Sequence, residues 1–306
     1  MKVWLVGGKG MLGTAVRERL ERSGVAHVTT DLELDITDLE RVRDFASAER
    51  PTHVINVAAY TRVDDAEAQE AAALSVNALG PEHLARAAAD VGAHFLHFST
   101  DYVFTGTAQE PYTEDAPTGP SSAYGRTKLA GEQRVLAVPG ADRLATIVRT
   151  SWLFGENGPS FPQTIAKLCL EREELRVVAD QRGRPTYTGD LADAALELAG
   201  LVGARGAAAP GIYHFANAGE TTWHAFAEAI RETLVRLGRP VKATRVVPVT
   251  TAEFPRPAPR PPYSVLDTRR IEAALGRKPR HFREPLDEFL TRLTSESPGG
   301  PARAVS

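Results

Sequence analysis

The chain has 306 residues, 42% of them hydrophobic, which is enough to bury one large core or two modest ones unaided. Its formal net charge is −3 and it shows no basic stripe of the kind that nucleic-acid backbones require. Cys169 is the only cysteine, which excludes an intrachain disulfide and fits a reducing cytosol. No signal peptide and no run of eighteen apolar residues is evident, so we expect a cytoplasmic protein that binds neither nucleic acid nor membrane.

The first half of the chain alternates short apolar runs with helical patterns. The expected strands are 2–6, 25–30, 53–57, 94–99 and 144–149, and the expected helices are 11–23, 39–49, 71–91 and 124–136. Such alternation is typical of right-handed crossovers and predicts an α/β fold, a Rossmann-like doubly wound parallel sheet. Residues 1–150 are therefore predicted to form a dinucleotide-binding domain.

The alternation loosens after Ser151, where glycine and proline become frequent. The expected helices are 163–171, 190–202, 222–237, 269–274 and 284–293, and the expected strands are 211–215 and 243–248. We interpret residues 151–294 mainly as a smaller C-terminal α/β substrate cap, with some segments returning to the Rossmann half, and 295–306 as a disordered tail. The proline-rich stretch 254–262 is either an extended surface linker or a rigid loop that carries Arg260 to a site.

Three glycines punctuate the first turn between a strand and a helix. Gly7, Gly10 and Gly13 are spaced G-x-x-G-x-x-G, directly after the strand and at the start of the helix, which is the context that gives this motif meaning. Glycines let the backbone approach a pyrophosphate, and the helix N-terminus offers free amides and the positive end of its dipole. The pattern predicts a dinucleotide cradle rather than a tight turn without a ligand.

Acidic residues after the second strand suggest the adenosine end of that cradle. Asp31 is placed to accept hydrogen bonds from a ribose diol, which slightly favours NADH over NADPH because a 2′-phosphate would meet like charge. The alternative is that Asp31 only caps a turn. Asp35 and Ile36 are candidates for the adenine amino group and ring face, although a helix N-cap at Thr37 or Asp38 is equally natural there.

Tyr124 and Lys128 stand four residues apart on a predicted helix, so both side chains project from one face. A free phenol titrates at about 10, and an adjacent ammonium favours the phenolate, which would make Tyr124 a usable proton donor. The pair alone is a weak signal. The order of glycine loop, Thr100 after an apolar strand, Tyr124 and Lys128 indicates a nicotinamide-dependent ketone reductase.

These residues resemble the extended short-chain dehydrogenase/reductase superfamily, and within it the dTDP-4-dehydrorhamnose reductase family. The resemblance extends from Gly7 to about Leu290, and its most specific segments are Ser-Thr-Asp-Tyr-Val-Phe at 99–104 and Arg-Thr-Ser-Trp at 149–152. It implies an NADH- or NADPH-dependent oxidoreductase acting on the C4 ketone of a nucleotide-sugar substrate, dTDP-4-dehydro-L-rhamnose.

The resemblance also implies roles for individual residues. Tyr124 would donate the proton, Lys128 would lower its pKa and hold the nicotinamide ribose, and Thr100 would hydrogen-bond the ketone oxygen. The implied cofactor contacts are Gly7, Gly10, Met11, Leu12, Gly13, Asp31, Asp35, Ile36, Ala58, Ala59, Tyr60, Thr61, Phe98, Tyr124 and Lys128. The implied substrate contacts are Thr100, Asp101, Trp152 and Arg260.

Each of these assignments has a plainer reading. Asp101 could be a turn residue and Trp152 could belong to the core. Trp223 is interpreted as packing and is left out of the site. The eight histidines show no metal-ligand spacing, so no protein metal site is expected. Family members are associated with magnesium, but no residue here places it, and a homodimer stays open.

Related activities remain as alternatives. A 4,6-dehydratase needs an Asp-Glu pair after the threonine, and the Asp101-Tyr102 pair argues against it. A 4-epimerase is disfavoured only by segment resemblance. A 4-ketoreductase for another nucleotide deoxysugar, such as dihydrostreptose synthase, is the nearest rival. A non-catalytic regulatory subunit, like that of methionine adenosyltransferase, is least favoured because Thr100, Tyr124 and Lys128 are all retained.

Overall fold

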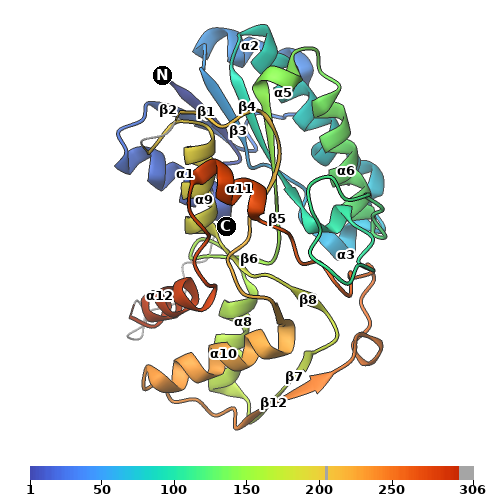
Figure 1. Cartoon of the computed structure of the whole chain (residues 1–306), viewed down its shortest axis with the longest axis vertical. Coiled ribbons are helices and arrows are strands. Elements are labelled where there is room, and N and C mark those ends of the chain that lie inside the picture. The colour runs from blue at the N-terminus through green and yellow to red at the C-terminus, as the bar shows by residue number, and fades with distance from the viewer. Residues whose placement is uncertain (204–205, 296–306) are drawn as a thin grey trace.

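The computed structural model of the chain describes residues 1–203 and 206–295 (Figure 1). The predicted tail therefore falls, apart from Ser295, outside the described residues. The strands are β1 (Val3–Val6), β2 (His27–Thr30), β3 (His53–Asn56), β4 (His94–Thr100), β5 (Ala145–Thr150), β6 (Leu153–Phe154), β7 (Glu174–Val178), β8 (Arg182–Gly183), β9 (Thr186–Tyr187), β10 (Gly211–His214), β11 (Thr221–Thr222) and β12 (Arg245–Val249). The helical elements are α1 (Met11–Arg22), α2 (Leu39–Glu49), α3 (Val63–Ala66), α4 (Glu70–Leu74), η1 (Ser75–Leu79), α5 (Gly80–Asp90), η2 (Asp101–Val103), α6 (Ala123–Leu136), α7 (Ala141–Leu144), α8 (Phe161–Glu171), α9 (Thr188–Leu198), α10 (Trp223–Arg236), η3 (Thr251–Glu253), α11 (Arg269–Leu275) and α12 (Arg283–Ser295).

A six-stranded sheet, in the order β10-β5-β4-β3-β1-β2 and with all neighbours parallel, forms the centre of the larger lobe. This confirms the predicted Rossmann-like doubly wound sheet. From β1 the chain proceeds to β2 on one side and then to β3 on the other, so the order of the strands reverses between β1 and β3. Open parallel sheets bind ligands outside the carboxyl ends of the strands at such a reversal.

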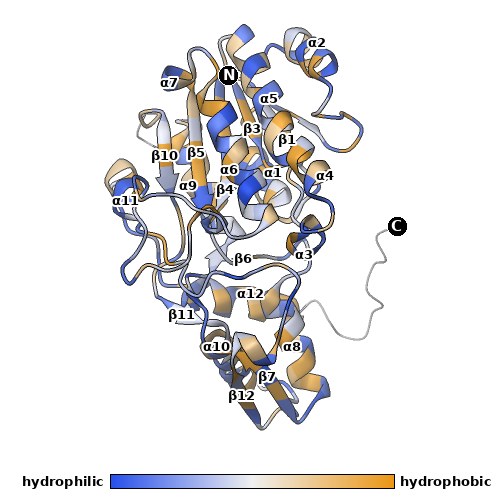
Figure 2. Ribbon diagram, turned by 90° about the vertical axis from the view of Figure 1, so that its right-hand side faces the viewer, coloured by the Kyte–Doolittle hydropathy of each residue, from blue (hydrophilic) through white to orange (hydrophobic). Residues whose placement is uncertain are grey.

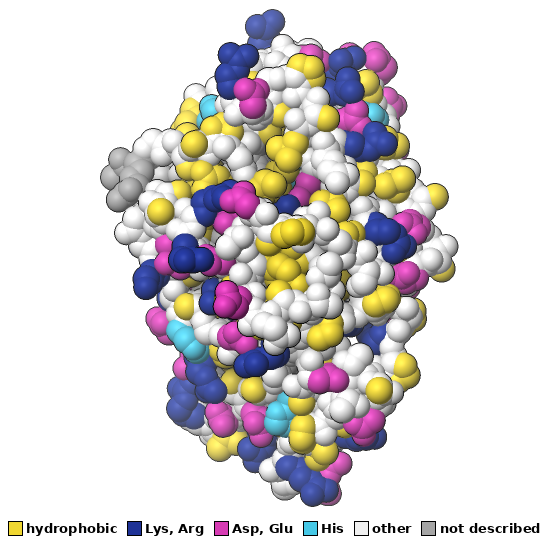
Figure 3. Space-filling model, turned by 45° about the vertical axis from the view of Figure 1, so that its right-hand side comes forward, with side chains coloured by type: hydrophobic (Ala, Val, Ile, Leu, Met, Phe, Trp, Pro, Cys, Tyr) yellow, Lys and Arg dark blue, Asp and Glu magenta, His cyan; other side chains and the backbone are white. Residues whose placement is uncertain are grey.

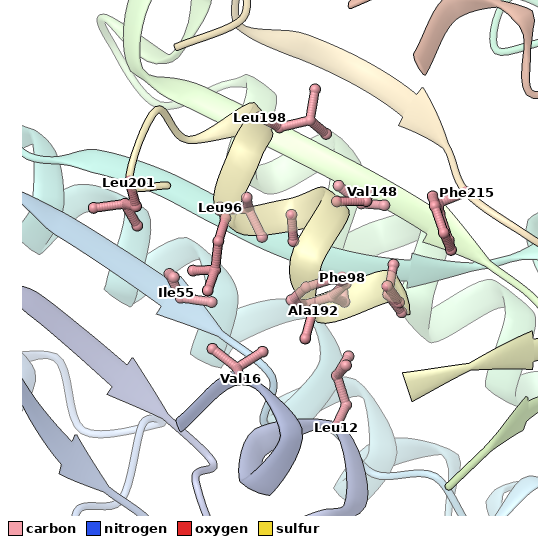
Figure 4. Packing of buried hydrophobic residues seen from close by; sticks show 14 of the residues in the cluster. Leu12, Val16, Ile55, Leu96, Phe98, Val148, Ala192, Leu198, Leu201 and Phe215 are labelled. Atoms are coloured by element: carbon pink, nitrogen blue, oxygen red, sulfur yellow. The ribbon is translucent and has the colours of Figure 1, made fainter. Parts of the chain in front are cut away.

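Side chains of the strands alternate between the two faces of the sheet, and each face has its own core. Val3 and Leu5 join the cluster under α1 and α9, whereas Trp4 and Val6 join the cluster under α2 and α5. Figure 4 shows the first cluster, where side chains from α1, β3, β4, β5 and α9 converge. Because both faces are covered, the middle of each central strand is mainly apolar, and the hydropathy colouring of Figure 2 shows hydrophobic residues along β5 with a hydrophilic end.

Two late segments pack on this first half of the chain. β10 pairs with β5 at the edge of the sheet, and α9 packs against α1. The smaller lobe consists of α8, α10 and α12 with the parallel pair β7–β12, around a core that includes Phe154, Phe226 and Phe289 (Figure 1). On the face of the molecule seen in Figure 3, acidic and basic side chains are interspersed.

The helix expected at 71–91 differs from the prediction, because a π-helical segment, η1, interrupts it between α4 and α5. The interruption places Asn77 in the interior, where its amide group donates to Thr127 Oγ1 at 3.1 Å and accepts from the Tyr60 amide at 2.8 Å. A Cβ on Gly131 would lie 2.1 Å from the Asn77 backbone carbonyl oxygen, so only glycine at this position lets α6 pack this closely against η1. Single π turns of this kind are frequent near functional sites.

A buried ion pair joins α6 to β5. Arg149 donates to both carboxylate oxygens of Glu132, at 2.9 and 2.6 Å, and the two side chains are 3% and 2% exposed. Two parallel hydrogen bonds of this type satisfy the charges of both partners. Removing one partner leaves the other charge buried without compensation, which is far more costly than the loss of a surface pair.

We therefore expect Glu132→Gln to lower the free energy of unfolding by about 3 kcal/mol, measured by urea denaturation. The matched control is Glu70→Gln, which breaks the half-exposed pair between Glu70 and Arg126 and should cost less than about 1 kcal/mol. Equal losses of unfolding free energy in the two variants would contradict the conclusion that the buried pair stabilises the fold more than the half-exposed pair does.

Candidate active site

The glycine loop between β1 and α1 is packed too tightly for side chains. Gly7 has a φ of +83°, and a Cβ there would lie 2.6 Å from the Ala58 nitrogen. A Cβ on Gly13 would lie 2.1 Å from the Gly7 carbonyl oxygen. Helix α1 begins after Gly10 with no side chain capping its amides, so the backbone around Met11 and Leu12 offers donors to an anion. The loop has the form of the predicted pyrophosphate cradle.

Asp31 lies beside this loop, at the carboxyl end of β2. Its carboxylate accepts hydrogen bonds from the Lys9 amide at 2.9 Å and from the Leu32 amide at 3.0 Å. Asp35 accepts from the amide and hydroxyl of Thr37, which lowers its pKa. The N-cap considered as an alternative is Asp38, whose carboxylate accepts from the Arg41 amide at 3.2 Å at the start of α2. Ile36 is buried and packs against Gly80 at the start of α5.

The segment after β3 follows the same edge of the sheet. Ala58, Ala59 and Tyr60 are half-buried there, and Thr61 is exposed. The Asn77 side chain holds the backbone of Tyr60 by two hydrogen bonds. Its Oδ1 accepts from the Tyr60 amide at 2.8 Å, and its Nδ2 donates to the Tyr60 carbonyl oxygen at 3.1 Å. Sequence reasoning assigned no role to Asn77, although an asparagine within an alanine-rich helix is the signal that could have indicated one.

The structure brings Thr100, Tyr124 and Lys128 together at the carboxyl end of β4. Ser122 is the N-cap of helix α6, and its hydroxyl accepts from the Gly125 amide. A Cβ on Gly125 would lie 2.3 Å from the Tyr102 carbonyl oxygen, so the glycine lets the first turn of α6 approach η2 closely. That approach sets Tyr124 beside the residues that follow β4.

Lys128 is anchored to β4 from the next turn of the same helix. Its Nζ donates to the Phe98 carbonyl oxygen at 2.7 Å and lies 3.4 Å from Nε2 of His97. The side chain is 2% exposed, and burial lowers the pKa of Lys128 to about 8, with the carboxylate of Glu132 opposing the shift. Phe98 itself is buried in the core under α1.

The electrostatics of Tyr124 differ from the expectation that Lys128 lowers its pKa. Burial raises the pKa of Tyr124 above its ordinary value, the Asp101 carboxylate raises it further, and the nearby Thr100 hydroxyl opposes the shift. The Nζ of Lys128 donates to the Phe98 carbonyl and contacts His97 instead of the phenol, so it does not lower the pKa of Tyr124 in this arrangement. The phenol is therefore held in its protonated form, which is the form that a proton donor needs.

Asp101 is buried rather than a surface turn residue, with 2% exposure. Its Oδ1 accepts from the Thr100 hydroxyl at 2.9 Å, and its Oδ2 makes no hydrogen bond of normal geometry among the described residues, although the Ser264 hydroxyl lies near enough to the carboxylate to oppose the rise in its pKa. Burial raises the pKa of this carboxyl group to about 6. An incompletely paired acid of this kind, next to a catalytic candidate, is a candidate functional position.

Trp152 follows β5 and stacks on Trp223, with the ring centroids 3.6 Å apart and the planes 8° from parallel. The φ of Trp152 is +48°, a left-handed conformation that is strained for a bulky residue. Gly183 makes room for the indole, because a Cβ there would lie 2.5 Å from Trp152 Cε2. Trp223, which was assigned to packing alone, thus supports the ring of a predicted substrate contact.

Arg260 lies in the 254–262 segment, which is fixed to the first lobe. Its guanidinium donates to Asp64 Oδ1 at 2.9 Å, and the Ala258 amide donates to the same oxygen at 3.2 Å. Arg256 lies 3.4 Å from the other oxygen of Asp64. These contacts favour the rigid-loop alternative over a free linker, and they hold Arg260 near the ring of Tyr102.

Metal ligands do not cluster in the described ranges 1–203 and 206–295, where no group of three or more His, Cys, Asp or Glu side chains is arranged to hold an ion. Magnesium is therefore not placed by this structure. Within the same ranges, no helix is long and apolar enough to cross a membrane.

A family model described as RmlD substrate binding domain matches residues 1–295. The chain belongs to that family. It is 47% identical over 295 residues to a dTDP-4-dehydrorhamnose reductase of Streptomyces griseus, covering 95% of this chain and 93% of the relative. This confirms the resemblance inferred from the sequence and the oxidoreductase class that it implies.

Two further comparisons bear on cofactor and substrate. The crystal structure of dTDP-4-dehydrorhamnose reductase from Bacillus anthracis in complex with NADP is 36% identical, with a TM-score of 0.86, over 95% of this chain and 99% of that one. A dTDP-4-keto-6-deoxy-D-glucose reductase of Streptomyces niveus is 44% identical over 267 residues, covering 86% of this chain and 88% of the relative.

The buried carboxyl of Asp101 makes stability depend on pH. Its folded pKa, about 6, lies above the ordinary 3.8, so its favourable contribution is present below pH 4 and is lost as the pH rises through 6. We expect Asp101→Asn to gain about 2 kcal/mol of unfolding free energy relative to the wild type between pH 4 and pH 7. Urea titrations at both pH values measure this, with exposed Asp44→Asn as the control, whose difference from wild type should not change with pH.

Proposed function

We propose that this protein reduces the C4 ketone of dTDP-4-dehydro-L-rhamnose to dTDP-L-rhamnose with NADH or NADPH, Tyr124 being the proton donor. The observation that carries the proposal is the convergence of Thr100, Tyr124 and Lys128 at the carboxyl end of β4, within a chain of this family. A chain kept only for binding has no need of all three groups.

The dinucleotide fits the edge of the sheet on which the glycine loop, Asp31 and the 58–61 segment lie. The loop leaves no room for side chains at Gly7 and Gly13, and α1 offers uncapped amides to a pyrophosphate. When bound, the reduced nicotinamide supplies a hydride. The residues assigned to hold it are those named from the sequence, from Gly7 to Lys128.

The protein's own residues manage the proton. The raised pKa of Tyr124 keeps its phenol protonated at neutral pH, so the group is loaded for donation to the ketone oxygen. Thr100 donates its hydroxyl proton to Asp101 and would rotate to hydrogen-bond the same ketone oxygen. Lys128, on the next turn of α6, gives up its proton more readily than an exposed lysine, because burial lowers its pKa to about 8.

Asp101, Trp152 and Arg260 are the proposed contacts to the sugar nucleotide. The free oxygen of Asp101 suits a sugar hydroxyl, and the indole of Trp152 suits the apolar face of a deoxysugar. Arg260 suits a diphosphate, since a guanidinium fork matches phosphate oxygens, with Asp64 as its partner until the substrate arrives.

A second candidate is a 4-ketoreductase for a different dTDP-deoxysugar. The observation that favours it is the 44% identity to a dTDP-4-keto-6-deoxy-D-glucose reductase. Both candidates use the same chemistry, so only the product separates them. The test supplies each ketone, generated enzymatically, with NADH or NADPH, follows oxidation at 340 nm and identifies the product by mass and NMR. Turnover of neither ketone would refute both.

Tyr124→Phe should keep cofactor binding and lose roughly 10²- to 10⁴-fold in kcat, because a positioned general acid contributes about that much. The matched control is Tyr213→Phe, on β10 and outside the site. This substitution removes a phenol hydroxyl that donates to the Ala209 carbonyl oxygen. Stopped assays with saturating substrate measure kcat, and cofactor fluorescence measures binding. Unchanged turnover in Tyr124→Phe would refute the assigned role.

Cofactor choice is proposed to favour NADH, on the basis of the Asp31 carboxylate next to the glycine loop. The relative from Bacillus anthracis is in complex with NADP, so the preference needs a direct test. We expect Asp31→Asn to raise kcat/KM for NADPH relative to NADH by about tenfold, roughly the worth of one nearby charge. Glu40→Gln, on α2, is the control. An unchanged ratio would remove Asp31 from the discrimination.

A further inference from the structure

A line of polar side chains crosses the sheet behind Lys128. Asn56 ends β3, and His97 stands opposite it on β4 in the sheet register. Both are 0% exposed. Neighbouring positions on these strands are apolar, and polar groups kept in such a place are expected to have complete hydrogen bonds.

The hydrogen bonds in this line have one direction. The Ala58 amide donates to Asn56 Oδ1 at 3.0 Å, so the other end of the carboxamide, Nδ2, faces His97 Nδ1, also at 3.0 Å. Because Nδ2 can only donate, Nδ1 must accept. A neutral imidazole then carries its hydrogen on Nε2, which points at Lys128 Nζ, 3.4 Å away.

The contact between His97 and Lys128 depends on the charge of the amine. A neutral amine has a lone pair that can accept from Nε2–H, whereas an ammonium has none, and two donors would then face each other. To receive an ammonium, the imidazole must move its hydrogen to Nδ1 and Asn56 must turn over. That rotation would withdraw the acceptor from the Ala58 amide.

Other charged groups around Lys128 are few. On α6 itself these are Tyr124 and Glu132, and the carboxylate of Glu132 is committed to Arg149 on β5. From β4 the facing groups are His97 and the Phe98 carbonyl. Asp101, after β4, acts on Tyr124. His97 is thus the titratable group in contact with the amine.

We propose that Asn56 and His97 are positioning residues for Lys128, because together they present the Nε2–H of His97 to its amine. Lys128 can then carry a proton only if the His97 hydrogen moves to Nδ1 and the Asn56 carboxamide turns over. This inference rests on the proposed function, in which Lys128 acts in catalysis. It connects the charge of Lys128 to the backbone at Ala58, which is an expected contact of the nicotinamide side. Cofactor binding at that segment would thereby alter the proton affinity of Lys128.

The tautomer of His97 is the direct test, and it requires no substrate. Nitrogen-15 NMR of the wild-type protein, labelled in histidine, distinguishes a ring protonated on Nε2, on Nδ1 or on both. We expect the Nε2–H form at pH 9, above the Lys128 pKa of about 8, and the Nδ1–H form at pH 7, where the amine is charged. The ring should not become doubly protonated down to pH 5, because burial and the Lys128 charge hold the pKa of His97 well below its usual range. A doubly protonated ring, or the same tautomer at pH 7 and pH 9, would overturn the proposal.

The pH profile of kcat tests the effect on Lys128. His97→Gln lets a carboxamide oxygen accept from the ammonium, which raises the pKa of Lys128, so the alkaline limb at which Lys128 loses its proton should move up by about one pH unit. The matched control is His94→Gln, at the exposed start of the same strand, whose profile should not move. A uniform loss of kcat without a shift would mean a merely structural role and would overturn the coupling.

Asn56→Asp provides a second variant with an opposite effect on the ring. An oxygen opposite Nδ1 can accept, so the NMR of this variant at pH 9 should show the hydrogen moved to Nδ1. Persistence of the Nε2–H form in Asn56→Asp would contradict the directed line. These NMR results remain readable if the ketone proves to be the wrong substrate, so failure of the proposed function and failure of this inference are distinguishable.

Discussion

The bidentate pair between Glu132 and Arg149 is the constraint on which the site depends. It is buried, and it fixes α6, which carries Tyr124 and Lys128, to β5, which leads into Trp152. One ion pair therefore links the helix of the proposed proton donor to the strand that leads to Trp152. The same carboxylate also opposes the loss of charge by Lys128, so a group that stabilises the fold also acts on a residue of the proposed site.

Much of the frame was predictable because it depends on short-range patterns. Apolar runs predicted the strands of the central sheet, and helical spacing predicted the helices beside it. The position of the glycine loop between the first strand and the first helix was also predicted. The π segment at Ser75–Leu79 was not, since it arises from Asn77 bonding to Tyr60 and Thr127, which are distant in sequence. Local propensity carries no information on such contacts.

The candidate site divides in the same way. Residue types and spacing proposed Thr100, Tyr124 and Lys128, which the structure places around the end of β4, but the expected lowering of the Tyr124 pKa by Lys128 differs from the structure, because it assumed that neighbours on a helix face interact directly. In the structure Lys128 turns to the Phe98 carbonyl and burial dominates the pKa of the phenol. Burial and side-chain direction are tertiary quantities, and Trp223 was assigned to packing alone for the same reason.

The stacked indoles of Trp152 and Trp223 also give the smaller lobe an optical signal of its own. Two parallel rings with centroids 3.6 Å apart couple their electronic transitions, whereas the third tryptophan, Trp4, is buried in the sheet and bonded to Thr30. Both coupled rings pack against the core of the smaller lobe, so any motion that turns or separates them changes that coupling. The chain therefore carries a circular dichroism reporter beside the predicted substrate contact Trp152, built from native residues and separate from the signal of the sheet.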